Sequence, residues 1–129
     1  MARLMSVAFT EQAVRDRTKT VTRRKGWTFL KPGDRLTLCR KVMGRKKDEP
    51  LVRVAEVEVV SVRREPLTDL LGGAAPWWTE YGREEMVREG FPGHDPHWFV
   101  AELFTVAQGI AADDEVTRIE WRYLDGGES

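Results

Sequence analysis

The amino-acid sequence predicts an α+β fold, in which helices flank a small, partly open β-barrel. Three segments predict the barrel, because apolar and polar residues alternate along residues 35–43, 51–62 and 116–124. Helical spacing appears between the second and the third of these segments. The chain has 129 residues, of which 41% are hydrophobic, and this excludes a disordered protein. We therefore expect residues 1–129 to form a single domain.

The first part of the chain predicts a strand, a helix and a turn. Residues 5–9 alternate between large apolar side chains and smaller or polar ones, which indicates a strand that ends at Thr10. Thr10 is expected to cap a helix that runs to about Arg17. The segment KPGD, residues 31–34, contains the proline and glycine of a turn that precedes the first long strand.

The second long alternating segment, LVRVAEVEVVSV, changes phase along its length. The alternation slips between Val54 and Val57, so that the apolar side chains on either side of the slip do not fit one regular strand. A β-bulge absorbs such a slip and is common where a sheet curls into a barrel. The polar residues 44–50 are expected to form the loop between this strand and the one before it.

Three helical segments are expected after the long strands. Residues 66–71 predict a helical turn, and residues 95–107 predict a helix with Asp95 as its cap. The third segment is TEYGREEMVREG, residues 79–90. Its inward side chains are expected to be Tyr81, Met86 and Val87, and Gly90 is expected to end it.

The chain has no net charge, but its charges are divided unevenly along the sequence. Residues 1–50 contain 14 Lys or Arg and 5 Asp or Glu, whereas residues 51–129 contain 7 and 16. A basic region on one side of the fold would attract a polyanion such as RNA. The alternative is that the two halves neutralise each other. The sequence leaves both possibilities open.

The cysteine and histidine content excludes several site types. The single cysteine, Cys39, excludes an internal disulfide, and its place in an alternating strand indicates a core residue with no base partner. His94 and His97 lack zinc-ligand spacing, so we expect no metal or other cofactor.

The N-terminal segment MARLMSVAFT has too short an apolar run for a signal peptide or membrane span, and we expect a cytoplasmic protein with no membrane partner. A monomer is the default expectation.

The basic residues are densest in RTKTVTRRKGW, residues 17–27, which contains five Lys or Arg and three threonines. Such a run on its own is typical of a solvated helix end, where cations favour the terminal carbonyl groups. If the segment lies at the mouth of the barrel, the same residues are candidates for a ligand site.

Several segments occur together in an order that resembles the ASCH-domain family, whose fold is the PUA-like barrel. They are TKTVTRR, FLKPGDRLTL, VEVVSVRREPL, EGFP, WFVAELF and VTRIEWRYL, and they span nearly the whole chain. The family signature is a glycine, one residue, a lysine, four residues and an arginine. Lys19 and Arg24 match the lysine and the arginine, whereas Arg17 stands where the glycine usually lies.

The resemblance implies a candidate activity. A similar member of the family is an amidohydrolase that removes the acetyl group from the exocyclic amine of acetylcytidine, using a lysine, a threonine three residues later and a distant glutamate. In this sequence those positions fall on Lys19, Thr22 and Glu89. Glu84 and Glu85 lie within about a turn of Glu89 and are alternatives for the glutamate.

These residue types suit deacylation without a metal. A threonine hydroxyl attacks a carbonyl once a base takes its proton, and a lysine is such a base when burial or nearby positive charge lowers its pKa. A carboxylate then orients the lysine or carries a proton to the leaving amine, while Arg24 or backbone donors stabilise the oxyanion. Residues three apart on a regular strand point to opposite faces, so Lys19 and Thr22 are expected to cooperate only in a loop or helical turn.

Two further functions stay open. The first is a non-catalytic module that binds RNA or a modified base, as PUA-like domains often do, with Lys19, Arg23 and Arg24 on phosphate. The second is a ribonuclease that uses the basic cluster, an activity also associated with similar proteins. Lys25 adds to the expected binding surface, and Trp27 beside it is a candidate for stacking on a base. The adjacent residues 77–78, both tryptophan, are further stacking candidates.

Overall fold

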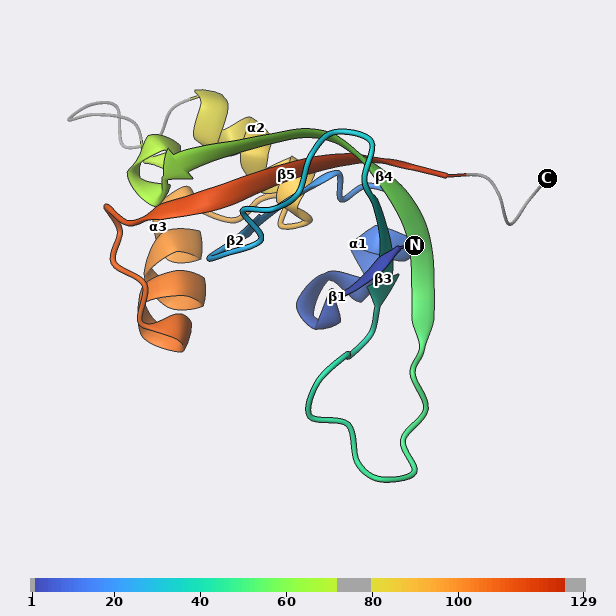
Figure 1. Ribbon diagram of the computed structural model, residues 1–129. Helices are drawn as coiled ribbons and strands as arrows, with labels where there is room; N and C mark the ends of the chain where they lie inside the picture. Colours follow the sequence, from blue (N-terminus) through green and yellow to red (C-terminus); the bar gives the residue numbers. More distant parts are fainter. Residues whose placement is uncertain (1, 72–79, 125–129) are drawn as a thin grey trace.

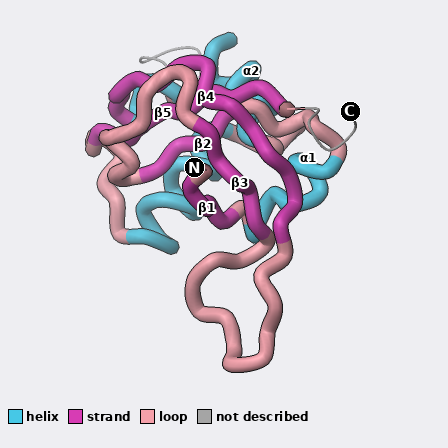
Figure 2. Tube along the Cα trace, turned by 45° about the vertical axis from the view of Figure 1, so that its right-hand side comes forward, coloured by secondary structure: helices cyan, strands magenta, loops and turns pink. Residues whose placement is uncertain are grey.

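The computed structural model describes residues 2–71 and 80–124. Within these ranges, five strands form one sheet in the order β1-β3-β4-β5-β2. The strands are β1 (Arg3–Ser6), β2 (Val21–Arg24), β3 (Arg35–Cys39), β4 (Arg53–Pro66) and β5 (Glu115–Tyr123). The β1 and β3 strands are parallel, and the other neighbours are antiparallel. The sheet curves strongly, and its edge strands β1 and β2 do not pair, so the predicted α+β fold with a partly open barrel is confirmed (Figures 1 and 2).

The long strand β4 bends at two bulges. On its β3 side, Leu38 lies opposite Ala55 and Cys39 opposite Arg53, which leaves Val54 as the extra residue. On its β5 side, the register shifts at Val60. The predicted bulge therefore lies at the beginning of the expected interval, and the sequence did not predict the second one. Two bulges in one strand allow β4 to pair with both neighbours while the sheet curls.

The expected first strand is too long. The strand in the structure, β1, ends at Ser6, and a 3₁₀ turn, Ala8–Thr10, follows it. The turn directs the side chain of Phe9 outward, where it is 89% exposed, whereas Val7 is buried. Helix α1 spans Glu11–Arg15, two residues shorter than expected, and Thr10 precedes it without a side-chain capping bond.

Helix α1 ends in a Schellman motif. The backbone N–H of Arg17 donates to the Val14 carbonyl at 3.0 Å, and the N–H of Thr18 donates to the Ala13 carbonyl at 2.9 Å. Arg17 has a φ of 63°, in the left-handed region that favours glycine. The position where the family signature carries glycine is thus one whose backbone conformation favours that residue.

Helix α2 spans Glu80–Glu89 and turns two glutamates inward. Its buried side consists of Gly82, Glu85, Met86 and Glu89. The expectation that Val87 points inward is wrong, because this side chain is 51% exposed. Gly82 permits close contact, since a Cβ atom at this position would lie 2.2 Å from the carbonyl oxygen of Leu70. The helix ends before Gly90, as predicted.

The other helical segments lie near their predicted positions. Leu67–Leu70 forms a 3₁₀ turn, and helix α3 spans Pro96–Trp98 and continues as a wider π-helical segment, Phe99–Val106. The Asp95 side chain caps this helix by accepting from the His97 N–H at 2.8 Å. The chain between β3 and β4 forms a long loop that extends away from the sheet (Figures 1 and 2). No helix in residues 2–71 and 80–124 is long and apolar enough to cross a bilayer.

The described residues form two hydrophobic clusters. One fills the inside of the curved sheet and includes Met5, Leu36 and Ile119. The other packs helices against the end of the sheet and includes Met86, Phe99 and Phe104. Several polar side chains of the basic segment that begins at Arg17 are also buried, namely Lys19, Thr22 and Arg23.

Candidate functional site

Lys19 is buried at the entry to β2 and is held at both ends. Its carbonyl oxygen accepts hydrogen bonds from Trp121 Nε1 at 3.1 Å and from Tyr123 Oη at 2.5 Å. Its Nζ donates to the carbonyl oxygen of Glu89 at 2.6 Å and to Glu89 Oε1 at 3.3 Å. The side chain is only 3% exposed, so the lysine is fixed in a nearly dry position.

Thr22 and Arg24 lie on the same strand, β2, two residues apart. Arg24 Nε donates to Thr22 Oγ1 at 3.2 Å, and Arg24 Nη2 donates to the Ser6 carbonyl at 2.6 Å. The second bond joins the two unpaired edges of the sheet, since Ser6 ends β1. Lys19 precedes the strand rather than lying within it, so strand alternation does not separate it from Thr22, and both residues line one cavity.

Arg23 is enclosed by carboxylates. Its Nη1 donates to Glu89 Oε2 at 2.9 Å, and its Nη2 donates to Glu65 at 2.9 Å and to Glu85 at 2.5 Å. Arg118 on β5 donates to both oxygens of Glu85, at 2.7 and 3.0 Å. For Arg23 the two oppositely charged parts of the sequence do neutralise each other.

We call this group of nearly inaccessible charged residues the buried ion cluster. It comprises Lys19, Arg23, Arg118, Glu65, Glu85 and Glu89. Its three positive charges balance its three negative charges. Each member forms a hydrogen bond with another member of the group. A buried charge is tolerated when it is paired in this way, whereas the loss of one partner is costly.

Two pKa shifts follow from this environment. Burial lowers the pKa of Lys19; Glu89 opposes this shift, and the positive charge of Arg24 adds to it. Burial alone would raise the pKa of Glu85, but hydrogen bonds from Arg118 and the charge of Arg23 outweigh it and lower the pKa to about 2. Lys19 is therefore easier to deprotonate than an ordinary lysine, and Glu85 is harder to protonate than an ordinary glutamate.

Three members of the buried ion cluster, Lys19, Arg23 and Glu89, line a cavity of about 400 Å³. The polar part of its lining includes Lys19, Thr22, Arg23, Arg24 and Glu89, together with Ser6, Thr10 and Gln108. The apolar part includes Phe9, Phe91, Phe99, Leu103, Phe104 and Ala107. Cavities of this size suit small molecules, and a few polar groups among apolar walls fix the orientation of a ligand. This cavity suits a molecule that is apolar or aromatic over part of its surface and accepts hydrogen bonds over another part.

The structure brings five of the seven proposed site residues together. Lys19, Thr22, Arg23, Arg24 and Glu89 all line the cavity. The other two do not. Lys25 is exposed, and Trp27 packs against the barrel core with its ring 5.5 Å from that of Phe29. The tryptophans at residues 77–78 lie outside the described residues.

The three candidate glutamates have different surroundings. Glu89 is the one that lines the cavity and contacts Lys19. Glu85 lies deeper, between Arg23 and Arg118, and Glu84 is exposed beside Arg88. The geometry thus favours Glu89 among the three for a role beside the lysine.

Sequence reasoning missed the support behind the cavity. Glu65 and Tyr81 come from segments far from β2, and the Tyr81 hydroxyl donates to Glu65 at 2.8 Å. One signal was available in the i, i+4 spacing of Glu85 and Glu89, which puts both on one helix face. Arg118 could not be anticipated, because its position opposite Arg23 depends on the register of β2 and β5.

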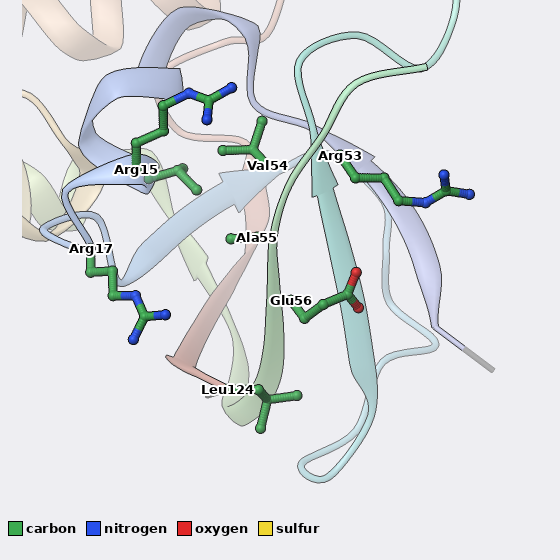
Figure 3. A pocket seen from close by; sticks show the side chains of 8 residues that line it. Arg15, Arg17, Arg53, Val54, Ala55, Glu56 and Leu124 are labelled. Atoms are coloured by element: carbon green, nitrogen blue, oxygen red, sulfur yellow. The ribbon is translucent and has the colours of Figure 1, made fainter. Parts of the chain in front are cut away.

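A second cavity, also of about 400 Å³, lies between α1 and the beginning of β4. Figure 3 shows Arg15 and Arg17 on one side of β4 and Arg53 extending on the other side. Arg15 pairs with Glu11 at 2.9 Å, and Arg17 lies over the Tyr123 ring. This cavity contains none of the residues that the sequence proposed for a site.

The residues considered for metal or thiol chemistry lie elsewhere. Cys39 is buried and unpaired, and burial raises the pKa of its thiol. His94 stacks on Trp98 with ring centroids 4.5 Å apart, and His97 contacts Asp95. In the part of the chain that the structure describes, no three His, Cys, Asp or Glu side chains form a group suited to a metal ion.

The curved sheet is a half-barrel with a lined cavity at its open edge, where β1 and β2 do not pair. More specifically, the fold is that of an ASCH domain. A high-resolution crystal structure of the ASCH domain from Lactobacillus crispatus JV V101 matches with a TM-score of 0.56, 11% sequence identity and coverage of 94% of this chain and 79% of that chain. The sequence matches no family model and no curated protein. The structural likeness agrees with the fold that the sequence resemblance implied.

Proposed function

We propose that the protein is an amidohydrolase that removes an acyl group from the exocyclic amine of acetylcytidine or a related modified nucleoside. One observation carries this proposal: a buried lysine with a lowered pKa shares a cavity of about 400 Å³ with Thr22 and Glu89. A base, a nucleophile and a carboxylate are the groups that acyl transfer requires. The sequence singled out the same three residues.

In the proposed reaction, Thr22 Oγ1 attacks the acyl carbonyl and gives its proton to Lys19 Nζ. The carbonyl π-electrons move to its oxygen, and the Arg24 guanidinium stabilises this oxyanion. When the intermediate collapses, the carbon–nitrogen bond breaks and the amine takes the proton from Lys19. The acyl group now forms an ester with Thr22. Water then attacks this ester and gives a proton to Lys19. The bond between the acyl carbon and Thr22 Oγ1 breaks, and Thr22 Oγ1 takes the proton back from Lys19, which releases the acid and restores both residues.

Glu89 has a positioning role in this proposal. Its carbonyl and carboxylate hold Lys19 Nζ, and Arg23 holds the second carboxylate oxygen. Within the described residues, no hydrogen bond joins Lys19 Nζ to Thr22 Oγ1. The proposal therefore requires the two atoms to approach when the substrate binds, as catalytic hydrogen bonds in unliganded enzymes often do.

A binding module for RNA or a modified base is the second candidate. It is favoured by the bond from Arg24 to Thr22 Oγ1, which occupies the proposed nucleophile in the unliganded protein. A ribonuclease is the weakest of the three readings, because Arg23 is enclosed by carboxylates and is not available to phosphate. For both the amidohydrolase and the binding module, we propose a modified nucleoside or RNA as the ligand. We also propose that the protein is located in the cytoplasm.

Hydrolysis of acetylcytidine by the purified protein tests the proposal. Cytidine release is followed by chromatography in the presence of a chelator, for the wild type, Thr22→Ala and Thr20→Ala. Thr20 is the matched control, since it lies two residues away and does not line the cavity. We expect release by the wild type and the control and at least a hundredfold loss in Thr22→Ala, the scale set by loss of a nucleophile. Equal rates for all three proteins would rule out Thr22 as the nucleophile.

Cleavage of unmodified RNA is measured alongside this reaction. RNA cleavage without release of cytidine from acetylcytidine would favour the ribonuclease. Salt-sensitive RNA binding with neither reaction would favour the binding module, because contacts to phosphate release counterions.

A further inference from the structure

Phe9 is the most exposed of the large hydrophobic residues in the described ranges, at 89%. Val7 and Thr10 on either side of it are buried, so the backbone turn Ala8–Thr10 fixes which residue points out. Phe9 nevertheless belongs to the lining of the same cavity as Lys19 and Thr22. An aromatic ring that is open to water and borders a cavity is positioned to contact what enters it.

The apolar part of this cavity comes from three separate parts of the chain, one of which is Phe91 after α2. Phe9 precedes α1, whereas Leu103 belongs to the helical segment that continues α3 and Ala107 follows that segment directly. The apolar lining thus extends from the buried rings of Phe99 and Phe104 to the exposed ring of Phe9. A ligand that fills the cavity therefore meets an aromatic ring at its outer end.

The polar part of the lining limits which apolar ligands fit. Lys19 and Arg24 provide N–H donors, and Thr22 provides a hydroxyl group in the same lining. Lys19 Nζ uses two of its three N–H groups on Glu89, and Arg24 uses two of its five on Thr22 and Ser6, so both keep N–H groups for a ligand in the part of the chain that the structure describes. An aliphatic molecule offers these remaining N–H groups no acceptor. A planar heterocycle with carbonyl acceptors satisfies the donors at its edge and presents a π-face for stacking.

We propose that Phe9 is a stacking residue that makes the cavity selective for a single planar base extruded from any helical stack. This inference rests on the proposed function for the nucleoside nature of the ligand, and adds the residue that selects it. Aromatic side chains stack on bases at about 1 to 3 kcal/mol per base, which corresponds to roughly a five- to 150-fold change in affinity. A base inside a duplex presents no free face and is excluded.

Binding to substituted proteins tests this role separately from catalysis. The dissociation constants for acetylcytidine and for a short single-stranded oligouridylate are measured in a Thr22→Ala background, where the proposed hydrolysis does not consume the ligand. The substitutions are Phe9→Trp, Phe9→Leu and Phe9→Ala. Met43→Ala is the control, because Met43 is 83% exposed in the loop between β3 and β4 and does not line the cavity. Thermal unfolding checks that each protein is folded.

We expect Phe9→Ala to weaken binding about tenfold or more, Phe9→Leu to recover only part of the loss, and Phe9→Trp to bind at least as well as phenylalanine. Met43→Ala should leave affinity unchanged. Duplex RNA of the same length should bind at least tenfold more weakly than the single strand. Equal affinity for Phe9→Leu and the parent would overturn stacking in favour of simple apolar contact.

The two proposals fail in different ways. If a base binds and its affinity depends on the ring at Phe9, but the wild type releases no cytidine, only the amidohydrolase proposal is lost. The opposite result is that the wild type hydrolyses acetylcytidine, but adding Phe9→Ala to the Thr22→Ala protein leaves its affinity for acetylcytidine unchanged. In that case only the stacking role is lost. Absence of binding to both probes would overturn the stacking role.

Discussion

Lys19 Nζ donates to both the carbonyl oxygen and the carboxylate of Glu89, 70 positions further along the chain. These bonds join the entry of β2 to the last residue of α2. Gly90, the residue after Glu89, allows this close approach. Gly90 has a φ of +94°, and a Cβ atom there would lie 3.1 Å from Ala13 and 3.5 Å from Lys19. The lysine and the helix end therefore approach closely because the residue between them has no side chain.

Replacement of Glu89 by glutamine should destabilise the protein strongly. The substitution keeps the backbone bond to Lys19 but removes the charge that faces Lys19 and Arg23 in a nearly inaccessible position. Breaking one partner of a buried pair costs roughly 3 to 5 kcal/mol, and the retained amide oxygen should reduce this to about 2 to 4 kcal/mol. Urea denaturation of Glu89→Gln measures the loss. Glu84→Gln, at an exposed position of the same helix, should change stability by less than about 0.5 kcal/mol. Similar small effects at both positions would contradict the buried ion cluster.

Acid should destabilise the protein through Glu85. Its folded pKa of about 2 lies below the ordinary value of 4.5, so between these values the unfolded chain binds the proton more tightly. The stabilisation is complete above about pH 4.5 and is lost as the pH falls towards 2, and the shift corresponds to roughly 3 kcal/mol. Urea denaturation between pH 2 and pH 7 should show this loss in the wild type. Glu85→Gln should be less stable at neutral pH and should vary less with acid, and a parallel decline in both proteins would speak against the shift.

Hydrolysis should increase with pH through the titration of Lys19. The proposed base must be neutral, and burial lowers its pKa below the ordinary value of 10.5. The rate should therefore reach half of its maximum below pH 10.5. Because Glu89 raises the pKa of Lys19, Glu89→Gln should move this midpoint to lower pH. The measurement is a profile of kcat/KM against pH for both proteins. If both proteins have the same midpoint, the group that titrates is not Lys19.

Arg17→Gly should be more stable than Arg17→Ala. Arg17 has a φ of 63° at the end of α1, a conformation that costs roughly 1 kcal/mol for a residue with a side chain. The substitution also removes the contact of the guanidinium with the Tyr123 ring, so Arg17→Ala is the matched control. We expect Arg17→Gly to exceed Arg17→Ala in thermal or urea stability by about 0.5 to 1 kcal/mol. An alanine protein as stable as the glycine protein would argue against the left-handed conformation.

Gly82→Ala should destabilise the protein although alanine favours helices. The new Cβ atom would lie 2.2 Å from the Leu70 carbonyl oxygen, so the helix or the preceding turn must shift. Overpacking of this kind costs roughly 1 to 3 kcal/mol, which exceeds the usual gain of about 1 kcal/mol from glycine to alanine in a helix. Glu84→Ala, on the exposed side of α2, is the control and should be near neutral. A gain in stability for Gly82→Ala would show that the contact is not tight.

Local patterns in the sequence are sufficient to predict the long strands and the end of α2. The alternation around Ile119 and the glycine after Glu89 are signals that neighbouring residues contain by themselves. Phe9 was assigned to a strand because it continues that alternation, and only the turn Ala8–Thr10 reverses its direction. The apolar character of Val87 predicts a core residue, whereas the packing of α2 gives the inward position to Glu85.

The candidate site could be predicted only in part, for a physical reason. Lys19, Thr22 and Arg24 lie within six residues of one another, so one motif contains them. The partners of Arg23 come from β4 and α2, and their meeting depends on how the sheet curls. Trp27 illustrates the opposite case, because its proximity to the basic segment indicated stacking on a base but its ring packs on the barrel core.

Mass spectrometry of the protein after brief mixing with acetylcytidine tests the central claim most directly. Acid quenching within the first turnover should trap an acetyl ester on Thr22, together with cytidine, and the ester should be absent from Thr22→Ala. Acetylcytidine that stays intact in the presence of unmodified, folded protein would contradict the claim that Lys19 and Thr22 form a catalytic pair.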